Sequence, residues 1–361
     1  MKYINHIVFI INVFALLALL GSYLAPYISP AVLWPIAFLG LAFPLIFIIN
    51  FCFVFYWLLQ WDIRIWYAIA VLLLGSFHIY HFIQFGTKKT EQKNNRINII
   101  SFNTHNFGVY ESDNIYDSSV FFNVLRDLNP DIMCFQEFVD IKTDVDTKMY
   151  KQLFKEYKHL YKVNVNDNDS NPTGYSVSIF TKYKILESGL VERVNAGGNC
   201  TIYCDLVTDK DTIRVVNTHL KSISFQQKDF ETISELKNGD NQSKVDFTSV
   251  KGIFARLKYA FVSRSKQVDI IKNFIDYSPY KVIICGDFND SPTSYSYNML
   301  RGDKKDAFVE SGSGVSPTYI GKMPNFRIDY ILCDKAFQVF NYKPQKLNFS
   351  DHKMISATLI Y

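Results

Sequence analysis

The residues of this 361-residue chain that are best suited to chemistry are polar side chains that follow or interrupt short apolar runs. A buried strand fixes the backbone beside such a side chain and so holds the polar group rigidly. Carboxylates and amides can bind a divalent cation, and a histidine can move a proton near neutral pH. In chain order these residues are Asn103, Glu137, His219, Asp287, Asn289, Asp329, Asp351 and His352.

The most informative stretch is CGDFNDSP at residues 285–292. The apolar run 282–285 predicts a buried strand, and Gly286 allows a sharp turn at its end. Asp287 and Asn289 then leave the turn on one side, where they can bind a metal ion or a phosphate. Gly-Asp and Asn-Asp are also ordinary turn pairs, so this stretch alone leaves both interpretations open.

The other polar motifs carry similar alternatives. Glu137 closes the run DIMCFQE and is a candidate ligand for Mg²⁺, which prefers one or two carboxylates. His219 ends VVNTHL, where it could donate to a phosphoryl oxygen, shuttle a proton or simply be a satisfied core histidine. Asn103 could bind a metal or cap a turn. Asp329 lies inside the strand RIDYIL, and a buried carboxylate needs a partner.

Short apolar or alternating runs predict the strands that position these groups. The expected strands are 96–103, 132–135, 175–180, 200–207, 213–216, 282–285, 327–332 and 354–360. Apolar residues at helical spacing predict helices at 118–129 and 251–277. Residues 222–250 are polar and of mixed charge, which indicates a surface insertion.

The first 86 residues contain only three charged side chains, whereas the rest of the chain is charged at ordinary density. Apolar segments near 6–24, 31–59 and 65–85 approach or exceed the roughly 20 residues that cross a bilayer. Pro35 and Pro44 interrupt the second segment, which can therefore kink or begin late. We predict an integral, multi-pass membrane region of about three helices at 1–86, a linker at 87–95 and a folded domain at 96–361.

The side of the membrane follows from the charges that flank the apolar segments. Lys2 and the terminal amine favour an inside N-terminus, and an odd number of spans then places the domain outside the cytoplasm. Lys88, Lys89, Lys93 and Arg96 favour the opposite orientation, but they lead into a long domain, where the positive-inside rule weakens. The prediction is an extracytoplasmic domain.

Charge and cysteine content exclude few classes of protein. The formal net charge of +4 is weakly basic and unlike the strong basic footprint of a dedicated nucleic-acid-binding protein, although it does not exclude one. The six cysteines show neither zinc-site nor disulfide spacing, so most of them are predicted to be small buried hydrophobic residues.

Seven segments in order resemble the endonuclease/exonuclease/phosphatase (DNase I-like) superfamily, and specifically a bacterial membrane-anchored member. They cover roughly residues 95–361 and are SFNTHNF, DIMCFQE, GYSVSIFTKYKI, VVNTHL, CGDFNDSP, RIDYIL and SDH. None of the core polar positions departs from the family's pattern. The resemblance implies an α+β fold, a four-layer αββα sandwich with the site at one end of two packed sheets.

The resemblance also implies a metal site. Glu137 would be the main ligand of Mg²⁺, assisted by Asn103 and Asp351, with Mn²⁺ as a substitute. Arg327 and Tyr175 are candidates for substrate binding, although a structural ion pair explains Arg327 equally well.

Hydrolytic roles follow from the same resemblance. His352 would be the general base or would contact the phosphate, with Asp329 orienting its imidazole. Asp287 would position or deprotonate the attacking water. Asn289 and His219 would stabilise the charge that develops on the phosphoryl oxygens.

We therefore expect a membrane-anchored, divalent-metal-dependent phosphoesterase whose substrate is a lipid headgroup, a nucleic acid or a small molecule. Lipid or other phosphodiesters rank slightly above nucleic acid, because the charge of the domain is low. The alternatives are a DNA or RNA endonuclease or exonuclease of the same superfamily, and a non-catalytic membrane scaffold that keeps the fold as a binding module. The lipid bilayer is an expected partner, and no obligate protein partner follows from the sequence.

Overall fold

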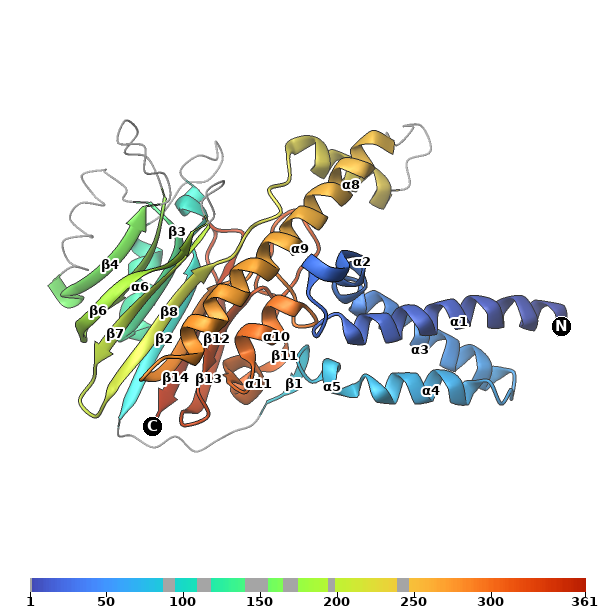
Figure 1. Cartoon of the computed structure of the whole chain (residues 1–361), viewed down its shortest axis with the longest axis horizontal. Helices are drawn as coiled ribbons and strands as arrows, with labels where there is room; N and C mark the ends of the chain where they lie inside the picture. The colour runs from blue at the N-terminus through green and yellow to red at the C-terminus, as the bar shows by residue number, and fades with distance from the viewer. Residues whose placement is uncertain are drawn as a thin grey trace.

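The structure, a computed structural model, describes residues 2–86, 95–108, 118–139, 155–164, 175–193, 199–238 and 247–361. Two six-stranded sheets pack against each other, and a group of N-terminal helices extends from one side of this sandwich (Figure 1). The α+β fold with two mixed sheets and a preceding helical region, which the sequence predicts, is confirmed.

Each sheet is mixed, with one parallel pair of strands among antiparallel ones. The first sheet has the order β13 (Gln338–Lys346), β14 (Lys353–Ile360), β2 (Arg96–Asn103), β3 (Ile132–Phe138), β5 (Ser176–Thr181) and β4 (His159–Asn164). The second has the order β10 (Lys305–Asp306), β12 (Asp329–Cys333), β9 (Lys281–Asp287), β8 (Thr212–His219), β7 (Cys200–Val207) and β6 (Lys184–Arg193). The parallel pairs are β2 with β3 and β8 with β9.

Alternation along the strands divides the core into layers, because successive side chains point to opposite faces of a sheet. Val215 and Ile283 pack between the two sheets, whereas their neighbours Val216 and Ile284 pack under helices of the outer layer. Those helices are α9 (Phe247–Asp276) and α10 (Tyr295–Arg301). The first sheet is covered by α6 (Ser118–Leu128). Five of the six cysteines are buried free thiols, as predicted.

The predicted insertion at 222–250 contains α8 (Gln227–Asn238) and the beginning of α9, which starts at Phe247 rather than at residue 251. Residues 239–246 lie outside the described residues. The remaining short elements are η1 (His105–Gly108), α11 (Ala307–Ser311), β1 (Ile83–Phe85) and β11 (Ser313–Val315).

The N-terminal region consists of α1 (Lys2–Leu24), α2 (Pro30–Leu41), α3 (Phe43–Leu59), α4 (Ile65–Leu74) and α5 (Ser76–Ile79). One described helix, Tyr3–Leu24, is long and apolar enough by itself to cross a membrane, and a signal sequence would satisfy the same test. The helices α2 and α3 are bent by 55° at the break before Phe43, and α4 has only ten residues. Three separate spans are therefore not supported.

The break in the second apolar segment has a local cause. Pro44 lies in the first turn of α3, where a missing backbone N–H is tolerated, so a helix begins there readily. Pro35 lies inside α2, and Leu33 leaves helical geometry just before it. Hydropathy alone detects the apolar run but not these interruptions.

The helical region is packed onto the sandwich. The Thr293 hydroxyl donates to the Gly40 carbonyl oxygen over 2.8 Å, and Asn298 Nδ2 donates to the Pro26 carbonyl oxygen over 3.0 Å. Strand β1 pairs antiparallel with β11. Residues 87–94, most of the predicted linker, lie outside the described residues.

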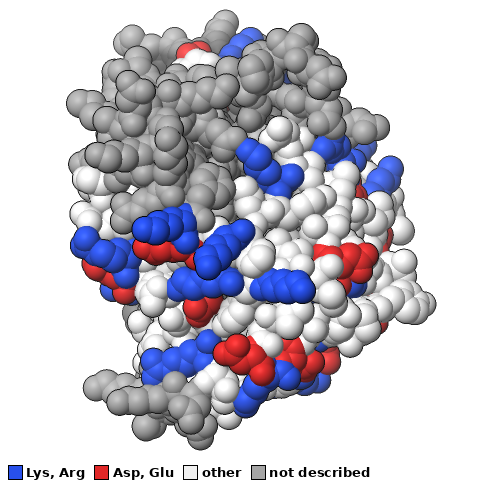
Figure 2. All heavy atoms as spheres, turned by 90° about the vertical axis from the view of Figure 1, so that its left-hand side faces the viewer, with Lys and Arg blue, Asp and Glu red and all other residues white. Residues whose placement is uncertain are grey.

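The end of the sandwich that faces away from the helical region carries mixed charge. Figure 2 shows basic side chains interspersed with acidic and uncharged ones over the described part of this face. A surface of mixed sign produces a weak net field.

Candidate active site

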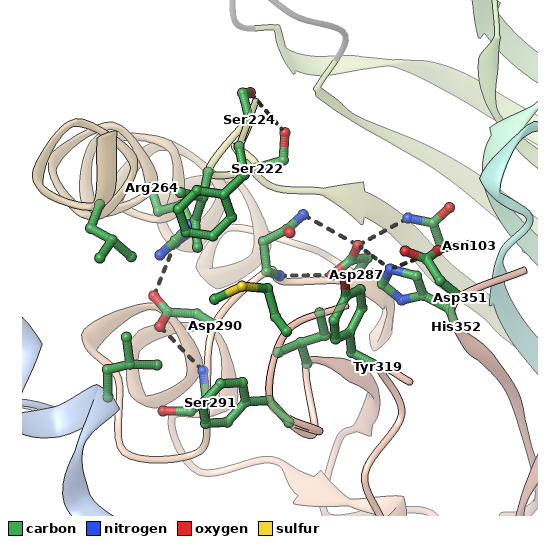
Figure 3. A pocket seen from close by; sticks show the side chains of 18 of the residues that line it. Asn103, Ser222, Ser224, Arg264, Asp287, Asp290, Ser291, Tyr319, Asp351 and His352 are labelled. Atoms are coloured by element: carbon green, nitrogen blue, oxygen red, sulfur yellow. Dashed lines mark hydrogen bonds and ion pairs between the residues drawn. The ribbon is translucent and has the colours of Figure 1, made fainter. Parts of the chain in front are cut away.

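A cavity of about 480 Å³ lies where strands from both sheets end (Figure 3). Seven of the predicted site residues line it: Asn103, Glu137, His219, Asp287, Asn289, Asp351 and His352. Asp329 lies directly behind His352, with its carboxylate against the imidazole.

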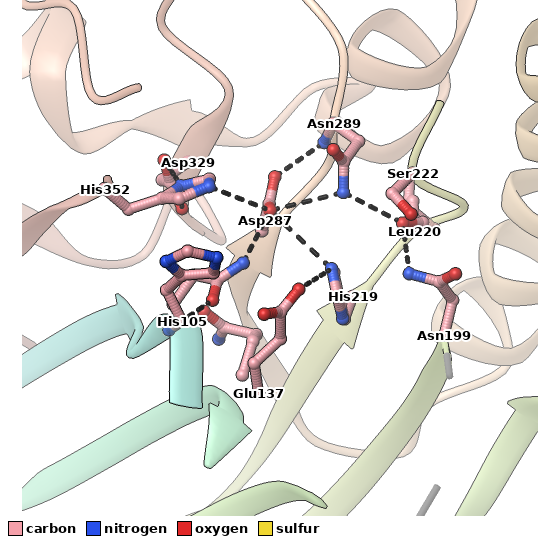
Figure 4. A network of polar contacts seen from close by, with 12 residues as sticks. His105, Glu137, Asn199, His219, Leu220, Ser222, Asp287, Asn289, Asp329 and His352 are labelled. Carbon is pink, nitrogen blue, oxygen red and sulfur yellow. Dashed lines mark hydrogen bonds and ion pairs between the residues drawn. The ribbon is translucent and has the colours of Figure 1, made fainter. Parts of the chain in front are cut away.

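Strand topology explains why these residues meet. The parallel strands β2 and β3 bring Asn103 and Glu137 to one end of the first sheet. In the same way, β8 and β9 bring His219 and Asp287 to the matching end of the second sheet. Strand β12 is antiparallel to β9, so β12 begins at the end of the sheet where β9 finishes. Asp329 is therefore directly opposite Asp287. Figure 4 shows the resulting network of polar contacts.

Asp287 is the centre of that network and has no solvent exposure. Its Oδ1 accepts from the Asn289 backbone N–H at 2.8 Å, and its Oδ2 accepts from Asn103 Nδ2 at 3.0 Å. Burial raises the pKa of Asp287 to about 6, although the charge of His352 opposes the rise. Asp287 is therefore an ionised but basic carboxylate at neutral pH, which suits a proton acceptor.

Gly286 places Asp287 at the end of β9 and cannot be replaced without strain. Its φ is +143°, and a Cβ atom there would lie 1.9 Å from the Thr218 carbonyl oxygen on the neighbouring strand. That oxygen belongs to the paired backbone and cannot move aside easily. The glycine lets β8 and β9 approach closely, so that His219 and Asp287 lie side by side.

We expect Gly286→Ala to lower the free energy of unfolding by about 3 kcal/mol, because it combines overpacking with an unfavourable backbone conformation. Chemical denaturation of the full chain would measure this loss. Gly252→Ala is the matched control, since a Cβ at that position on α9 meets nothing within 4 Å. The control should be neutral or stabilising by about 0.5–1 kcal/mol. Equal effects of the two substitutions would contradict this explanation.

Glu137 is held in an uncommon backbone conformation, with φ of +49°. It lies where the pairing of β3 with β5 shifts register between Phe135 and Phe138. The Thr104 hydroxyl donates to the Glu137 carbonyl oxygen over 2.7 Å and stabilises the bulge. Bulges of this kind re-aim a side chain, and here the carboxylate points into the cavity.

Glu137, Asn103 and Asp351 fit a hard divalent cation. Burial raises the pKa of Glu137, and the neighbouring Asp351 carboxylate adds to the rise, while His105, His352 and the Asn103 amide oppose it. Asp351 Oδ1 is buried and accepts no hydrogen bond from any described residue. Two carboxylates and an amide supply the oxygen donors that Mg²⁺ prefers.

A second group of possible ligands lies beside the first. One donor atom from each of Asp287, Asp329 and His352 lies within 4.8 Å of the others, and all three residues are buried. However, His352 Nδ1 is already bound to Asp329, at 3.0 Å from Oδ2 and 3.2 Å from Oδ1. We therefore favour the oxygen donors of Glu137, Asn103 and Asp351 as the metal site.

The carboxylates around His352 favour the cationic form of its imidazole. Burial alone would lower the pKa of His352, but the carboxylates of Asp329 and Asp287 outweigh it and raise the pKa to about 10. Thr318 Oγ1 accepts from the Asp329 backbone N–H at 3.0 Å and fixes this strand end. Of the two predicted roles for His352, a positively charged contact for phosphate agrees better with this geometry than a general base.

In metal-free protein, we expect the His352 imidazole to stay protonated through neutral pH and to lose its proton near pH 10. Because this pKa lies above the ordinary 6.5, the pair stabilises the fold below pH 6.5 and the stabilisation is lost as pH rises through 10. Nuclear magnetic resonance of the ring protons in EDTA would measure the titration. Asp329→Asn should move it towards 6.5, and an unmoved titration would show that Asp329 does not control the imidazole.

His219 and Asn289 both lie against the carboxylate of Asp287. His219 Nε2 is 3.6 Å from Glu137 Oε1 and 3.7 Å from Asp287 Oδ2, and neither ring nitrogen has a hydrogen-bond partner among the described residues. Burial lowers the pKa of His219, so its neutral ring can donate one N–H. Asn289 Nδ2 donates to both the Leu220 carbonyl oxygen and Asp287, so it holds Asp287 in place rather than facing a phosphate.

The two predicted substrate-binding residues differ in position. Arg327 is buried, its guanidinium contacts Asp306 at 2.8 Å, and it donates to the His81 carbonyl oxygen, so it has the structural ion pair that was its alternative. Tyr175 lies at the start of β5. Burial and then the charge of Glu137 raise its pKa to about 12, which places it near the carboxylate.

Two further residues belong to the site. His105 Nδ1 lies 3.4 Å from Asp351 Oδ1, and the Tyr319 ring lies edge-on to His352 with centroids 5.3 Å apart. His105 is inside the SFNTHNF segment and could have been noticed there. Tyr319 follows no apolar run, and an isolated bridge to His352 brings it in.

The sequence of the cavity-forming domain matches a known protein family. The family model described as "Endonuclease/Exonuclease/phosphatase family" matches residues 100–352, which include every strand-end residue of the cavity. The chain belongs to this endonuclease/exonuclease/phosphatase family. A second model, a domain of unknown function (DUF8431), matches residues 5–82. None of the curated proteins matches the chain.

Several solved structures share the family fold. The endonuclease/exonuclease/phosphatase from Bacteroides vulgatus aligns with a TM-score of 0.52 and 17% identity over 73% of this chain and 98% of its own. The one from Beutenbergia cavernae DSM 12333 has a TM-score of 0.51 and 17% identity over 74% and 72%. D. rerio TDP2, complexed with a single-strand DNA product, has a TM-score of 0.51 and 18% identity over 74% and 99%. At these identities the likeness concerns the fold alone.

Proposed function

We propose that this chain is a Mg²⁺-dependent phosphoesterase that hydrolyses a phosphodiester or phosphomonoester by in-line attack of water, with Mn²⁺ as a substitute ion. The main support for this proposal is that one cavity contains both the oxygen donors around Glu137 and the buried pair of Asp287 and His352. Hydrolysis of an anionic ester needs both charge neutralisation and a positioned water. These two groups can provide both.

The roles follow from the protonation states. Asp287, ionised at neutral pH, accepts a proton from the attacking water. The water oxygen bonds to phosphorus as the bond between phosphorus and the ester oxygen breaks, and the departing alcohol takes a proton from solvent. The charged His352 donates its Nε2–H to a phosphoryl oxygen, and Asp329 holds the ring from behind through Nδ1. Bound by Glu137, Asn103 and Asp351, Mg²⁺ would supply Lewis-acid stabilisation of the phosphate oxygens.

The remaining polar residues assist. His219 donates a neutral N–H to a second phosphoryl oxygen, since its ring nitrogens have no other described partner. Asn289 fixes Asp287. Tyr175 is not among the residues that line the cavity, so this proposal gives it no role.

The proposal includes attachment to a bilayer by residues 1–86, with residues 96–361 as the catalytic domain on the extracytoplasmic side. Large apolar side chains on the first helices are well exposed, including Phe14 at 69%, Ile48 at 59% and Leu73 at 67%. Exposed apolar surface of this extent is typical of a lipid or protein contact.

A nuclease of the same family is the alternative. D. rerio TDP2 was solved with a single-strand DNA product, which is a statement about that protein. In this chain, Arg264 is the only Lys or Arg among the described residues that line the cavity, and its Nε lies 3.1 Å from Asp290 Oδ2. A groove that follows a nucleic-acid backbone needs several available cations.

A substrate panel tests the proposal. Detergent-solubilised full chain would be assayed with bis-p-nitrophenyl phosphate, plasmid DNA, RNA, sphingomyelin and inositol phosphates, with Mg²⁺ and with EDTA. We expect Mg²⁺-dependent turnover of at least one substrate, lost in His352→Ala and retained in His159→Ala, a control on strand β4. A folded chain that turns over none of them would favour the non-catalytic scaffold.

A further inference from the structure

The cavity extends well beyond the polar cluster. In Figure 3, Asn103, Asp287 and His352 lie towards one side of the cavity, and Arg264 and Asp290 lie towards the other. Leu41, the last residue of α2, also lines the cavity. The cavity volume of about 480 Å³ lies within the range of sites for small organic molecules. The polar cluster uses only part of this space. We call the remainder, which is lined mainly by Phe230, Ile233, Leu257, Phe261 and Leu41, the apolar arm.

Helices α8 and α9 form two walls of the apolar arm. Phe230 and Ile233 of α8 form one wall, and Ile253, Leu257 and Phe261 of α9 form the other. Phe230, Ile233 and Leu257 remain half-buried beside the cavity. A space lined in this way gains free energy when hydrocarbon displaces its water.

The third wall is the segment between β11 and β12. Met323 and Phe326 line the cavity, and Lys322 Nζ lies 5.5 Å from the centroid of the Phe230 ring on the facing wall. Tyr319 links this wall to the catalytic cluster through its edge-on contact with His352. The apolar arm is therefore continuous with the site of hydrolysis.

The far end of the arm is made by the apolar N-terminal region. The Phe38 ring of α2 packs on Phe254 and Phe261 of α9, with centroids 5.3 and 5.2 Å apart. This contact fixes Leu41 at the end of the cavity. On the outside of the same junction, Val32 is 83% exposed and Phe254 is 52% exposed, so apolar surface continues from the arm to the exterior.

Arg264 is the only Lys or Arg among the described residues that line the cavity, and Lys322 lies against Phe230 at its wall. Arg264 is buried, donates to the Lys221 carbonyl oxygen at 2.8 Å and is paired with Asp290. Its charge is therefore already compensated. Ser222, Ser224 and Ser291 also line the cavity, but most of its lining beyond the polar cluster is apolar. The sugar or a further phosphate of a nucleotide would therefore lie largely against apolar side chains.

We propose that the apolar arm binds the hydrocarbon chain of the substrate, which makes the substrate a phosphate ester of a lipid alcohol. The proposal rests on the proposed phosphoesterase activity and adds the class of the substrate to it. The ester phosphorus would lie among Glu137, Asp287 and His352, and the chain would extend along α8 and α9 towards Leu41. An opening beside α2 would let the chain enter directly from a bilayer.

A homologous series of alkyl p-nitrophenyl phosphates, from methyl to octyl, tests the arm, because every member has the same leaving group. With full chain and Mg²⁺, we expect kcat/KM to rise up to about fourfold per methylene until the arm is filled. Thymidine 5′-(p-nitrophenyl phosphate) serves as the nucleotide probe and should react more slowly than the octyl ester.

Two variants that shorten the arm sharpen the test. Leu257→Trp on α9 and Ile233→Trp on α8 should each flatten the dependence of kcat/KM on chain length. Ile270→Trp is the matched control, because Ile270 lies on the same helix as Leu257, is 50% exposed and does not line the cavity. It should keep the full dependence.

A binding measurement separates failure of the arm from failure of the enzyme. Calorimetric titration of full chain with hexyl phosphate and methyl phosphate, in Mg²⁺, should show at least about 100-fold tighter binding of hexyl phosphate, lost in Leu257→Trp. Turnover of the methyl ester with no effect of chain length would overturn the arm and leave the phosphoesterase intact. Tight hexyl phosphate binding without any turnover would overturn the phosphoesterase and support the arm. Preference for the thymidine ester would overturn the lipid assignment.

Discussion

Asp287→Asn should lower kcat by a factor of about 10³, within the 10²–10⁴ range that a positioned proton acceptor contributes. The asparagine keeps the shape of the side chain but cannot accept the proton of the attacking water. It also places an NH₂ group among the donors Asn103 Nδ2, Asn289 N and Asn289 Nδ2, where the carboxylate accepts all three. Steady-state kinetics with bis-p-nitrophenyl phosphate would measure the change.

The control for this substitution is Asp276→Asn, at the exposed end of α9, which should leave kcat unchanged. Circular dichroism would verify that both variants are folded. A folded Asp287→Asn protein with more than a third of the original kcat would remove Asp287 from the proton-transfer step. His352 would then be the remaining candidate, and its high pKa argues against that role.

Glu137→Gln should raise the Mg²⁺ concentration for half-maximal activity by at least about 100-fold, because it removes a ligand charge from the proposed metal site. The same substitution should also stabilise the metal-free protein. The sign follows from the raised pKa of Glu137, since its carboxylate charge is unfavourable in the folded protein when no cation compensates it. A gain in stability together with loss of activity is typical of a functional charge.

Thermal unfolding with and without Mg²⁺ would measure both effects. Mg²⁺ should stabilise the native chain, since a ligand that binds only the folded state raises its stability, and it should not stabilise Glu137→Gln. Glu187→Gln on strand β6 is the matched control and should behave as the native chain. If Asp329→Asn rather than Glu137→Gln abolished the Mg²⁺ effect, the metal would belong to the group of Asp287, Asp329 and His352.

The sequence predicted which polar residues meet in the cavity, because each of them is adjacent to its own apolar strand. Asn103, Glu137, His219 and Asp287 are each located by the run that precedes them. What the runs could not predict is register. The pairing of Asp287 with Asp329 across β9 and β12, and the use of both amide hydrogens of Asn289, depend on contacts between distant segments.

The apolar arm was not predictable for the same reason. Phe230, Leu257, Phe326 and Leu41 come from four separate parts of the chain, and none of them follows a motif. The prediction of three membrane spans is not supported, for a different reason. Hydropathy measures the length of an apolar segment but not whether that segment forms one continuous helix. Pro44 begins a new helix inside the second apolar segment, and α4 ends at Gly75 after ten residues.

The most direct test of the account is a Mg²⁺ titration of bis-p-nitrophenyl phosphate hydrolysis by the full chain, started from EDTA. We expect no turnover in EDTA, saturable activation by Mg²⁺, and loss of that activation in Glu137→Gln at the same metal concentrations. Equal turnover in EDTA and in Mg²⁺, or an unchanged titration in Glu137→Gln, would contradict the assignment of this cavity as a metal-dependent phosphoesterase site.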